Sequence, residues 1–209
     1  MANNFRQRLS GKRSLSSGAG AGANYDMTIY LISDPHFSHE NIIKYCNRPF
    51  QHAEEMDEFM VDRWNAVVSP TDHVYVLGDV AMRRQHLHIV SRLQGKKRLI
   101  FGNHDIFDYK DYVNAGFQKL MSYRVIANVI LSHIPLHPSS INSKFIGNIH
   151  GHIHNNPEHP GRYLNVSAEK LDYTPISIDE ARVRLRKRIE EQTLPCRPDG
   201  GRDGSGLFF

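Results

Sequence analysis

The sequence has few cysteines and no long apolar run. Its two cysteines, Cys46 and Cys196, lie far apart, and neither belongs to a C-x-x-C motif. This usage disfavours a structural disulfide and indicates a reducing compartment. No apolar stretch approaches the roughly 20 residues that span a bilayer, and the N-terminal segment lacks the apolar core of a secretory signal. We therefore expect a cytoplasmic protein that makes no contact with a membrane.

Most of the chain also lacks an excess of positive charge. The overall charge is +4, but residues 1–26 hold four basic and one acidic residue, and residues 182–209 hold seven basic and four acidic residues. Residues 27–181 therefore carry a net charge of −2 and contain all thirteen histidines. Because the basic excess lies at the two ends, it weakens the argument for nucleic-acid binding that a high isoelectric point would otherwise support.

The two ends lack the apolar residues of a folded core. Residues 1–26 are rich in glycine and serine, and residues 192–209 are rich in glycine and proline. We predict that they form a disordered leader and a disordered tail. Met27 opens the first strand pattern, which suggests the hypothesis that Met27 is the natural start. Residues 27–191 predict one domain, large enough to bury a core.

Strand patterns alternate with helix patterns within residues 27–191. Strands are predicted over residues 27–33, 73–77, 98–101, 129–131, 145–149 and 162–166. Helices are predicted over residues 39–46, 56–68 and 177–191, and around Leu87, Val90 and Leu93. The order of strand, helix and strand in the first half predicts a parallel sheet covered by helices, and therefore an α/β fold.

Side chains that can bind a metal follow five of these strands. They are Asp34 and His36, Asp79, Asn103, His133, and His152 with His154. Asp34-x-His36 and His152-x-His154 share a spacing that in extended backbone places both side chains on one side, so that each pair could clamp one ion. His150 has the same spacing from His152, and strand geometry alone does not exclude it. We expect these strand ends to converge on one site.

The candidate ligands are too many for one tetrahedral zinc. Seven residues suit a binuclear metal centre in which two ions share a bridging carboxylate. Carboxylate, amide and imidazole ligands without a thiolate indicate a divalent ion such as manganese (Mn²⁺), Fe²⁺ or Zn²⁺. Such a centre suits the attack of an activated water on a phosphate ester, so we predict phosphoester hydrolysis.

These motifs carry a resemblance to a known family. Taken in order, they resemble the full motif set of the calcineurin-like metallophosphoesterases: Asp34-x-His36, Gly78-Asp79, Gly102-Asn103-His104-Asp105, His133 and Gly151-His152-x-His154. The resemblance spans about Met27 to Ile178. The stretches DPHFSHENII (residues 34–43) and RYLNVS (residues 162–167) further resemble small phosphoesterases of bacteria and their phages.

The resemblance implies a fold and a ligand set. The fold is two mixed β-sheets packed as a sandwich and flanked by helices. The ligand set divides between two ions: Asp34, His36 and His154 hold one, Asn103, His133 and His152 hold the other, and Asp79 bridges them. The resemblance also favours His152 and His154 over His150.

The resemblance implies further that His104 is the catalytic histidine. It would lie near the leaving oxygen as a general acid or charge stabiliser, and Asp105 could orient it. Phosphoprotein phosphatases of this family continue Gly-Asp with an acidic residue three positions later and then Arg-Gly, whereas here Asp79 is followed by Val80-Ala81-Met82-Arg83-Arg84. This departure disfavours a protein substrate. Ser132 also stands before His133, where many relatives have glycine.

Four residues near the motifs are candidate substrate contacts, namely His39, Arg48, Arg83 and His137. A role as surface or capping residues is at least as compatible with their positions. We predict a phosphatase or phosphodiesterase that acts on a small phosphorylated metabolite, with a nucleotide suggested by the resemblance alone.

Two alternatives stand beside this prediction. A metal-dependent nuclease is supported only by the basic helix over residues 177–191, which lacks interleaved aromatic residues for base stacking. A non-catalytic scaffold that retains the fold would show lost ligands, and the motif set is complete.

Overall fold

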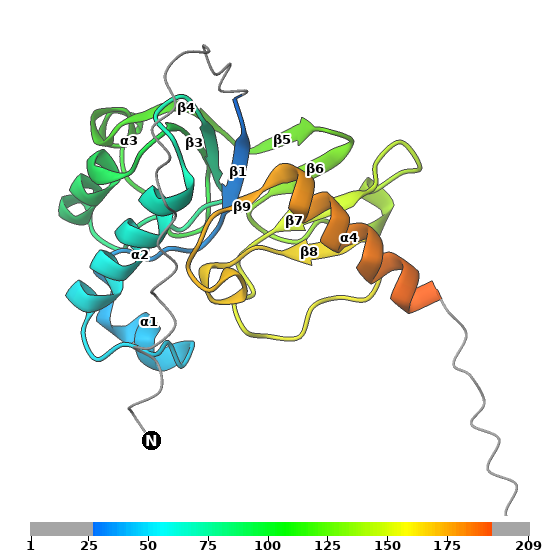
Figure 1. Cartoon of the computed structure of the whole chain (residues 1–209), viewed down its shortest axis with the longest axis horizontal. Helices are drawn as coiled ribbons and strands as arrows, with labels where there is room; N and C mark the ends of the chain where they lie inside the picture. The colour runs from blue at the N-terminus through cyan, green and yellow to red at the C-terminus, as the bar shows by residue number, and fades with distance from the viewer. Residues whose placement is uncertain (1–26, 194–209) are drawn as a thin grey trace, which may run out of the picture.

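A computed structural model of the chain describes residues 27–193 (Figure 1). The predicted leader lies outside the described residues, and so does the predicted tail from residue 194 onward. Residues 192 and 193 belong to the last helix, which is therefore slightly longer than predicted. Within the described part of the chain, we find no helix with the length and apolar character needed to cross a bilayer.

The first sheet has five strands in the order β4-β3-β2-β1-β9. Its parallel strands are β1 (Ile29–Ile32), β2 (His73–Val76), β3 (Lys96–Ile100) and β4 (Phe117–Met121). The short strand β9 (Ile176–Ser177) pairs antiparallel with β1. The sheet is therefore mixed, and its parallel strands all end at the same edge.

The second sheet has four strands in the order β5-β6-β7-β8. They are β5 (Tyr123–Ile126), β6 (Val129–Ser132), β7 (Gly147–His150) and β8 (Tyr163–Asn165). The edge strand β5 is antiparallel to β6, and the other pairs are parallel. The prediction of an α/β protein with two mixed sheets and helices is confirmed.

Helices connect and cover the strands. They are α1 (Glu40–Tyr45), α2 (Ala53–Val67), η2 (Arg84–Arg92), α3 (Tyr109–Ala115) and α4 (Ile178–Thr193), with short 3₁₀ turns η3 (Pro138–Ser140) and η4 (Ala168–Leu171). In Figure 1, α1, α2 and α3 lie on one side of β1, and β5–β8 with α4 lie on the other.

Four elements correct the predictions. The segment around Leu87 is a 3₁₀ helix rather than an α-helix. Helix α3 was not predicted, because its seven residues make only two turns, too few for a clear periodic pattern. Its ends are set by a capping box between Asp108 and Asp111 and by Gly116 in the left-handed conformation (φ 112°). Strands β4 and β5 were also missed, because β5 is a largely exposed edge strand without the alternation of a half-buried strand.

Alternate residues of the first sheet enter two separate cores. Val74 and Val76 of β2 face the helices, where Trp64 of α2 is among the largest buried side chains. Tyr75 and Leu77 face the second sheet, where they share a core with Leu131 of β6 and residues of α4. The period of two along each strand thus packs the sheets face to face and brings their strand ends together.

Leu131 is fully buried between the two sheets (0% exposed). We expect Leu131→Ala to lower the free energy of unfolding by about 2–5 kcal/mol, because it leaves a cavity between the sheets. Urea denaturation measures this change. Val183→Ala, at a residue of α4 that is 58% exposed, is the control and should change stability by less than about 0.5 kcal/mol. Equal effects of the two substitutions would contradict this description of the core.

Candidate metal centre

The seven predicted ligands come from loops that follow five parallel strand ends. Asp34 and His36 follow β1, Asp79 follows β2, Asn103 follows β3, His133 follows β6, and His152 and His154 follow β7. Because the two sheets pack face to face, these loops meet at one edge of the sandwich. A site at the carboxyl ends of parallel strands is the usual location in α/β proteins.

The side chains form two groups of possible metal donors. Donor atoms of Asp34, His36 and His154 lie within 4.8 Å of one another, and so do those of Asp79, His133 and His152. The division is the one that the family resemblance implies, while the ligand roles themselves stay a prediction.

Asp79, a member of the second group, also lies close to the first group. Its Oδ2 is 3.7 Å from His36 Nε2 and 3.5 Å from His133 Nε2. Asn103 joins the second group, because its Oδ1 is 2.9 Å from His133 Nε2. A carboxylate in this position has the geometry needed to serve both groups.

The first group contains buried polar atoms that lack a partner. Asp34 is 0% exposed and His36 is 2% exposed. Within residues 27–193, Asp34 Oδ1 and both ring nitrogens of His36 make no hydrogen bond. Buried polar atoms are nearly always paired, because desolvation without a partner is costly. These donors therefore fit a bound divalent cation.

Burial also shifts the pKa values of the Asp34 carboxyl and the His36 imidazole. It raises the pKa of the Asp34 carboxyl, and a cation bound nearby would act in the opposite direction. It lowers the pKa of His36 to about 2, so the imidazole stays neutral and keeps a lone pair free. The low pKa of His36 favours a metal ion over a proton at this imidazole.

Glu169 supports His154 and was not predicted. Its Oε1 is 3.1 Å from His154 Nδ1, while His154 Nε2 lies 3.8 Å from Asp34 Oδ1. Burial by itself would lower the pKa of His154, but its contacts with Cys46, Glu169 and Asp34 raise it to about 10. A carboxylate on the second ring nitrogen is a common way to orient a metal-binding histidine. The only signal in the sequence was the resemblance over residues 162–167, which stops two residues before Glu169.

Arg48, a predicted substrate contact, is buried away from solvent (4% exposed). Its guanidinium donates hydrogen bonds to the backbone carbonyls of Asp34 and Pro35, each at 2.8 Å, and to Glu169 Oε1 at 2.8 Å. Arg48 thus fixes the loop that carries Asp34 and holds Glu169 beside His154. Its donors are engaged within the protein, so its position is that of a structural support.

The other predicted substrate contacts lie in different places. His39 is half-buried and lines the cleft of about 510 Å³ into which the two donor groups open, with its ring centroid 5.6 Å from that of His36. Arg83 and His137 are exposed, and among the described residues neither lines this cleft. Of the four, His39 is the one that the fold places beside the donors.

His104 is exposed and lines the same cleft. Its ring centroid is 5.8 Å from that of His36, and it belongs to neither donor group. Its backbone N–H donates to Asp79 Oδ1 at 2.9 Å, which places the residue directly beside the central carboxylate.

Asp105 does not orient His104, as the sequence suggested it could. Its carboxylate accepts backbone N–H groups of Asp79 at 2.7 Å, Gly102 at 2.8 Å and Val80 at 3.1 Å. Burial raises the pKa of this carboxyl, and the three N–H donors act in the opposite direction. Asp105 therefore ties the loop after β3 to the loop after β2.

The backbone at five of the predicted ligands is left-handed. The φ angles are 55° at Asp34, 50° at His36, 55° at Asp79, 70° at His152 and 48° at His154. The expectation of extended backbone at the two i, i+2 pairs is therefore wrong. His152 and His154 also fall in different donor groups instead of clamping one ion. Left-handed backbone at a residue other than glycine costs about 1–3 kcal/mol and concentrates at functional sites.

Gly151 allows two loops to approach closely. A Cβ atom at this position would collide with the Ser33 hydroxyl and with Asp34 Oδ2. The contact that this space permits is a 2.8 Å hydrogen bond from the backbone N–H of His152 to Asp34 Oδ2. Ser167 Oγ donates to the same oxygen at 2.9 Å.

We expect Asp105→Ala to lower the free energy of unfolding by about 2 kcal/mol or more, because it leaves three buried N–H groups without an acceptor. The variant should also retain less metal, although Asp105 belongs to neither donor group. Asp105→Asn keeps one acceptor oxygen. Its free energy of unfolding and its metal content should therefore lie between those of Asp105→Ala and those of the wild type. Denaturation and elemental analysis measure both effects, and wild-type metal content in Asp105→Ala would contradict the assigned role.

Gly151→Ala should abolish metal retention by displacing Asp34. The matched control is Gly161→Ala, whose Cβ would lie 4.0 Å from the Tyr163 ring but whose backbone is left-handed (φ 101°). We expect the control to lose stability through backbone strain and to keep its metal. Metal content by elemental analysis separates the two effects, and equal metal retention would refute the steric argument.

No protein-family model matches the chain. It is 40% identical over 167 residues to the uncharacterized protein MJ1445 of Methanocaldococcus jannaschii, an alignment that covers 72% of this chain and 87% of that protein. It is 33% identical over 81 residues to the Gene 66 protein of Mycobacterium phage L5, covering 36% and 39% of the two chains.

Among solved structures, the chain is similar to AQ665 of Aquifex aeolicus, a protein of unknown function. The TM-score is 0.62 at 28% identity, over 74% of this chain and 97% of that one. A nuclease MPE of Pseudomonas putida aligns at a TM-score of 0.44 and 20% identity, over 60% and 61% of the two chains, and so remote a likeness carries no argument. On the evidence of its sequence, the chain belongs to the same family as MJ1445 of Methanocaldococcus jannaschii.

Proposed function

We propose that this protein is a metal-dependent phosphoester hydrolase with a binuclear centre. The observation that carries the proposal is the pair of buried residues Asp34 and His36, whose donor atoms lack partners within the described chain. These atoms lie beside a second donor group, whose Asp79 carboxylate also lies close to the first group. The proposal also draws on the motif resemblance, which favours a small metallophosphoesterase domain over residues 27–191.

In this proposal each donor group holds one ion. Asp34, His36 and His154 bind the first, Asn103, His133 and His152 bind the second, and Asp79 serves both. When bound, a pair of divalent ions such as Mn²⁺, Fe²⁺ or Zn²⁺ supplies charge stabilisation for a phosphoryl group and acidifies a water molecule. The chain's own part is to hold these donors in place: Glu169 orients His154, and Arg48 fixes the Asp34 loop.

His104 is the proposed catalytic residue. Its ring lies in the cleft, outside both donor groups, and its backbone bond to Asp79 holds it next to the centre. A histidine in this position can donate a proton to the leaving oxygen of a phosphoester. His39 lines the same cleft and is the proposed contact for the substrate phosphate.

The charge distribution favours a small phosphoester over a polynucleotide. Four basic residues of α4 form ion pairs: Arg182 with Asp179, Arg184 with Glu180, Lys187 with Glu191, and Arg188 with Glu158. These pairs reduce the positive field that would attract a phosphate backbone. The basic helix thus gives the nuclease alternative little support.

The test is hydrolysis of p-nitrophenyl phosphate and its bis-ester with added Mn²⁺. We expect His104→Ala to keep both ions and lower kcat by about 10²–10⁴-fold, because it removes a proton donor. Asp79→Ala should lose both ions, because it removes the carboxylate that the two groups share. His88→Ala, at an exposed histidine of η2, is the matched control and should behave as wild type. Steady-state kinetics and elemental analysis give the two readouts.

Two outcomes would contradict the proposal. Absence of hydrolysis of either ester by protein that holds two ions would refute the hydrolase function. Equal metal loss in His104→Ala and Asp79→Ala would show that His104 is a ligand instead of a proton donor.

A further inference from the structure

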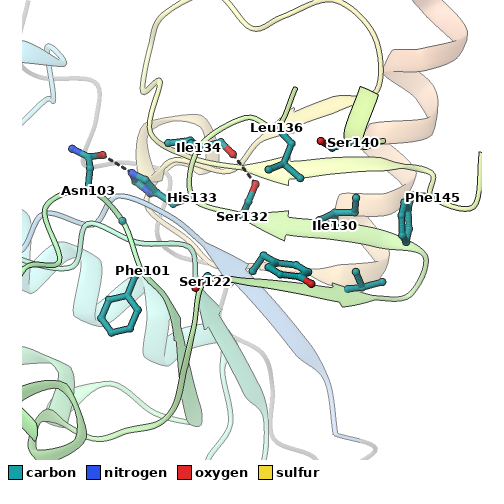
Figure 2. Close-up of a pocket in the computed structure, with 13 residues that line it drawn as sticks. Phe101, Asn103, Ser122, Ile130, Ser132, His133, Ile134, Leu136, Ser140 and Phe145 are labelled. Carbon is teal, nitrogen blue, oxygen red and sulfur yellow. Dashed lines mark hydrogen bonds between the residues drawn. The ribbon is translucent and has the colours of Figure 1, made fainter. Parts of the chain in front are cut away.

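A second cavity, largely apolar, lies next to the candidate metal centre. Its volume is about 720 Å³, within the range of small-molecule sites. It lies on the face of β5 and β6 that points away from the core between the sheets (Figure 2). The alternation along β6 explains this position, because Val129 and Leu131 enter the core while Ile130 and Ser132 line the cavity.

The cavity wall has no acidic or basic side chain other than His133. Of its thirteen residues, none is Asp, Glu, Lys or Arg, and three are the aromatic residues Phe101, Tyr123 and Phe145. Ser132 Oγ donates to the backbone carbonyl of Ile134 at 2.7 Å, so this hydroxyl is already paired (Figure 2). A wall of this kind favours an apolar, uncharged group.

Apolar side chains are exposed around the cavity. Tyr123 is 62% exposed, Val125 is 41% exposed and Ile134 is 51% exposed. Clustered exposure of this kind marks a site that binds a ligand or a partner. A stable protein interface takes about 20–30 residues from each partner, which is more than this cavity offers. Its size therefore favours a small molecule over a second copy of the chain.

The cavity and the metal cleft meet at Asn103, which lines both. Asn103 Oδ1 lies 2.9 Å from His133 Nε2 (Figure 2). His133 Nε2 in turn lies 3.2 Å from His152 Nδ1. His133 also lines the apolar cavity. A molecule in the cavity therefore lies directly beside the second donor group.

We propose that this cavity binds the uncharged, apolar organic group of a phosphoester whose phosphoryl group lies in the metal cleft. The inference rests on the proposed function and deepens it, because it specifies the substrate class as esters of aromatic or other apolar alcohols. Because Asn103 lines both the apolar cavity and the metal cleft, one molecule can place its apolar group in the cavity and its phosphoryl group in the cleft. The uncharged wall disfavours substrates with a second phosphate in this cavity.

Benzylphosphonate and ethylphosphonate test the inference, since both carry the same phosphonate and neither can be hydrolysed at a P–O ester bond. Their affinities for protein supplied with Mn²⁺ are measured by isothermal titration calorimetry. We expect benzylphosphonate to bind about tenfold more tightly or better, because its ring is buried in the cavity. Val125→Asp should remove this preference and leave ethylphosphonate binding unchanged.

Val113→Asp on α3 is the matched control, because Val113 is similarly exposed (43%) and lies outside the cavity. It should keep the preference for benzylphosphonate. A second readout needs neither metal nor activity: p-cresol should shift amide resonances of residues 122–136 in the wild type and not in Val125→Asp.

The outcomes separate this inference from the proposed function. Equal affinity for the two phosphonates, or no response to p-cresol, in a protein that hydrolyses phosphoesters would overturn the inference alone. Absence of any hydrolysis would overturn both, because the apolar group would then belong to no substrate. A wild-type dimer that Val125→Asp dissociates in sedimentation would show that a second copy covers the cavity, which also overturns the inference.

Discussion

The candidate centre depends on buried carboxylates that bind the backbone of neighbouring loops. Asp34 accepts the N–H of His152 from the other sheet, Asp79 accepts the N–H of His104, and Asp105 accepts three N–H groups from two loops. All of these bonds except the one from Gly102 to Asp105 join segments that are distant in sequence. Charge-assisted bonds of this kind are stronger than neutral ones, and burial strengthens them further. They fix the positions of the loops of the two sheets relative to one another.

This network accounts for the strained backbone at the site. Five of the predicted ligands have left-handed φ angles, which Asp and His adopt more readily than most residues but still at an energetic cost. The strain is offset by the hydrogen bonds to Asp34 and Asp105 and by the two hydrophobic cores. Its effect is to turn donor atoms of Asp34 and His36 into a buried position where no group of residues 27–193 pairs with them. Such an arrangement is poised to bind a cation.

Two cavities of different character meet at this centre. The polar cleft contains the donors and His104, whereas the adjoining cavity is apolar and lies on the exposed face of the second sheet. The polar cleft derives from loops, and the apolar cavity derives from the outward side chains of β5 and β6. Chemistry and selectivity would therefore depend on separate elements, which join at Asn103.

The sequence by itself determined which residues stand at the strand ends, because apolar runs and ligand types are local features. Its strand and helix patterns predicted the α/β class, and the resemblance that its motifs carry implied two mixed sheets and the division of His152 and His154 between two ions. The tertiary structure decided the remainder: the left-handed backbone, the support by Arg48 and Glu169, and the bonds of Asp105. Each of these depends on groups from distant segments, which the spacing of residues along the chain does not encode. The apolar cavity belongs here as well, since it forms only where β5, β6 and the following loops come together.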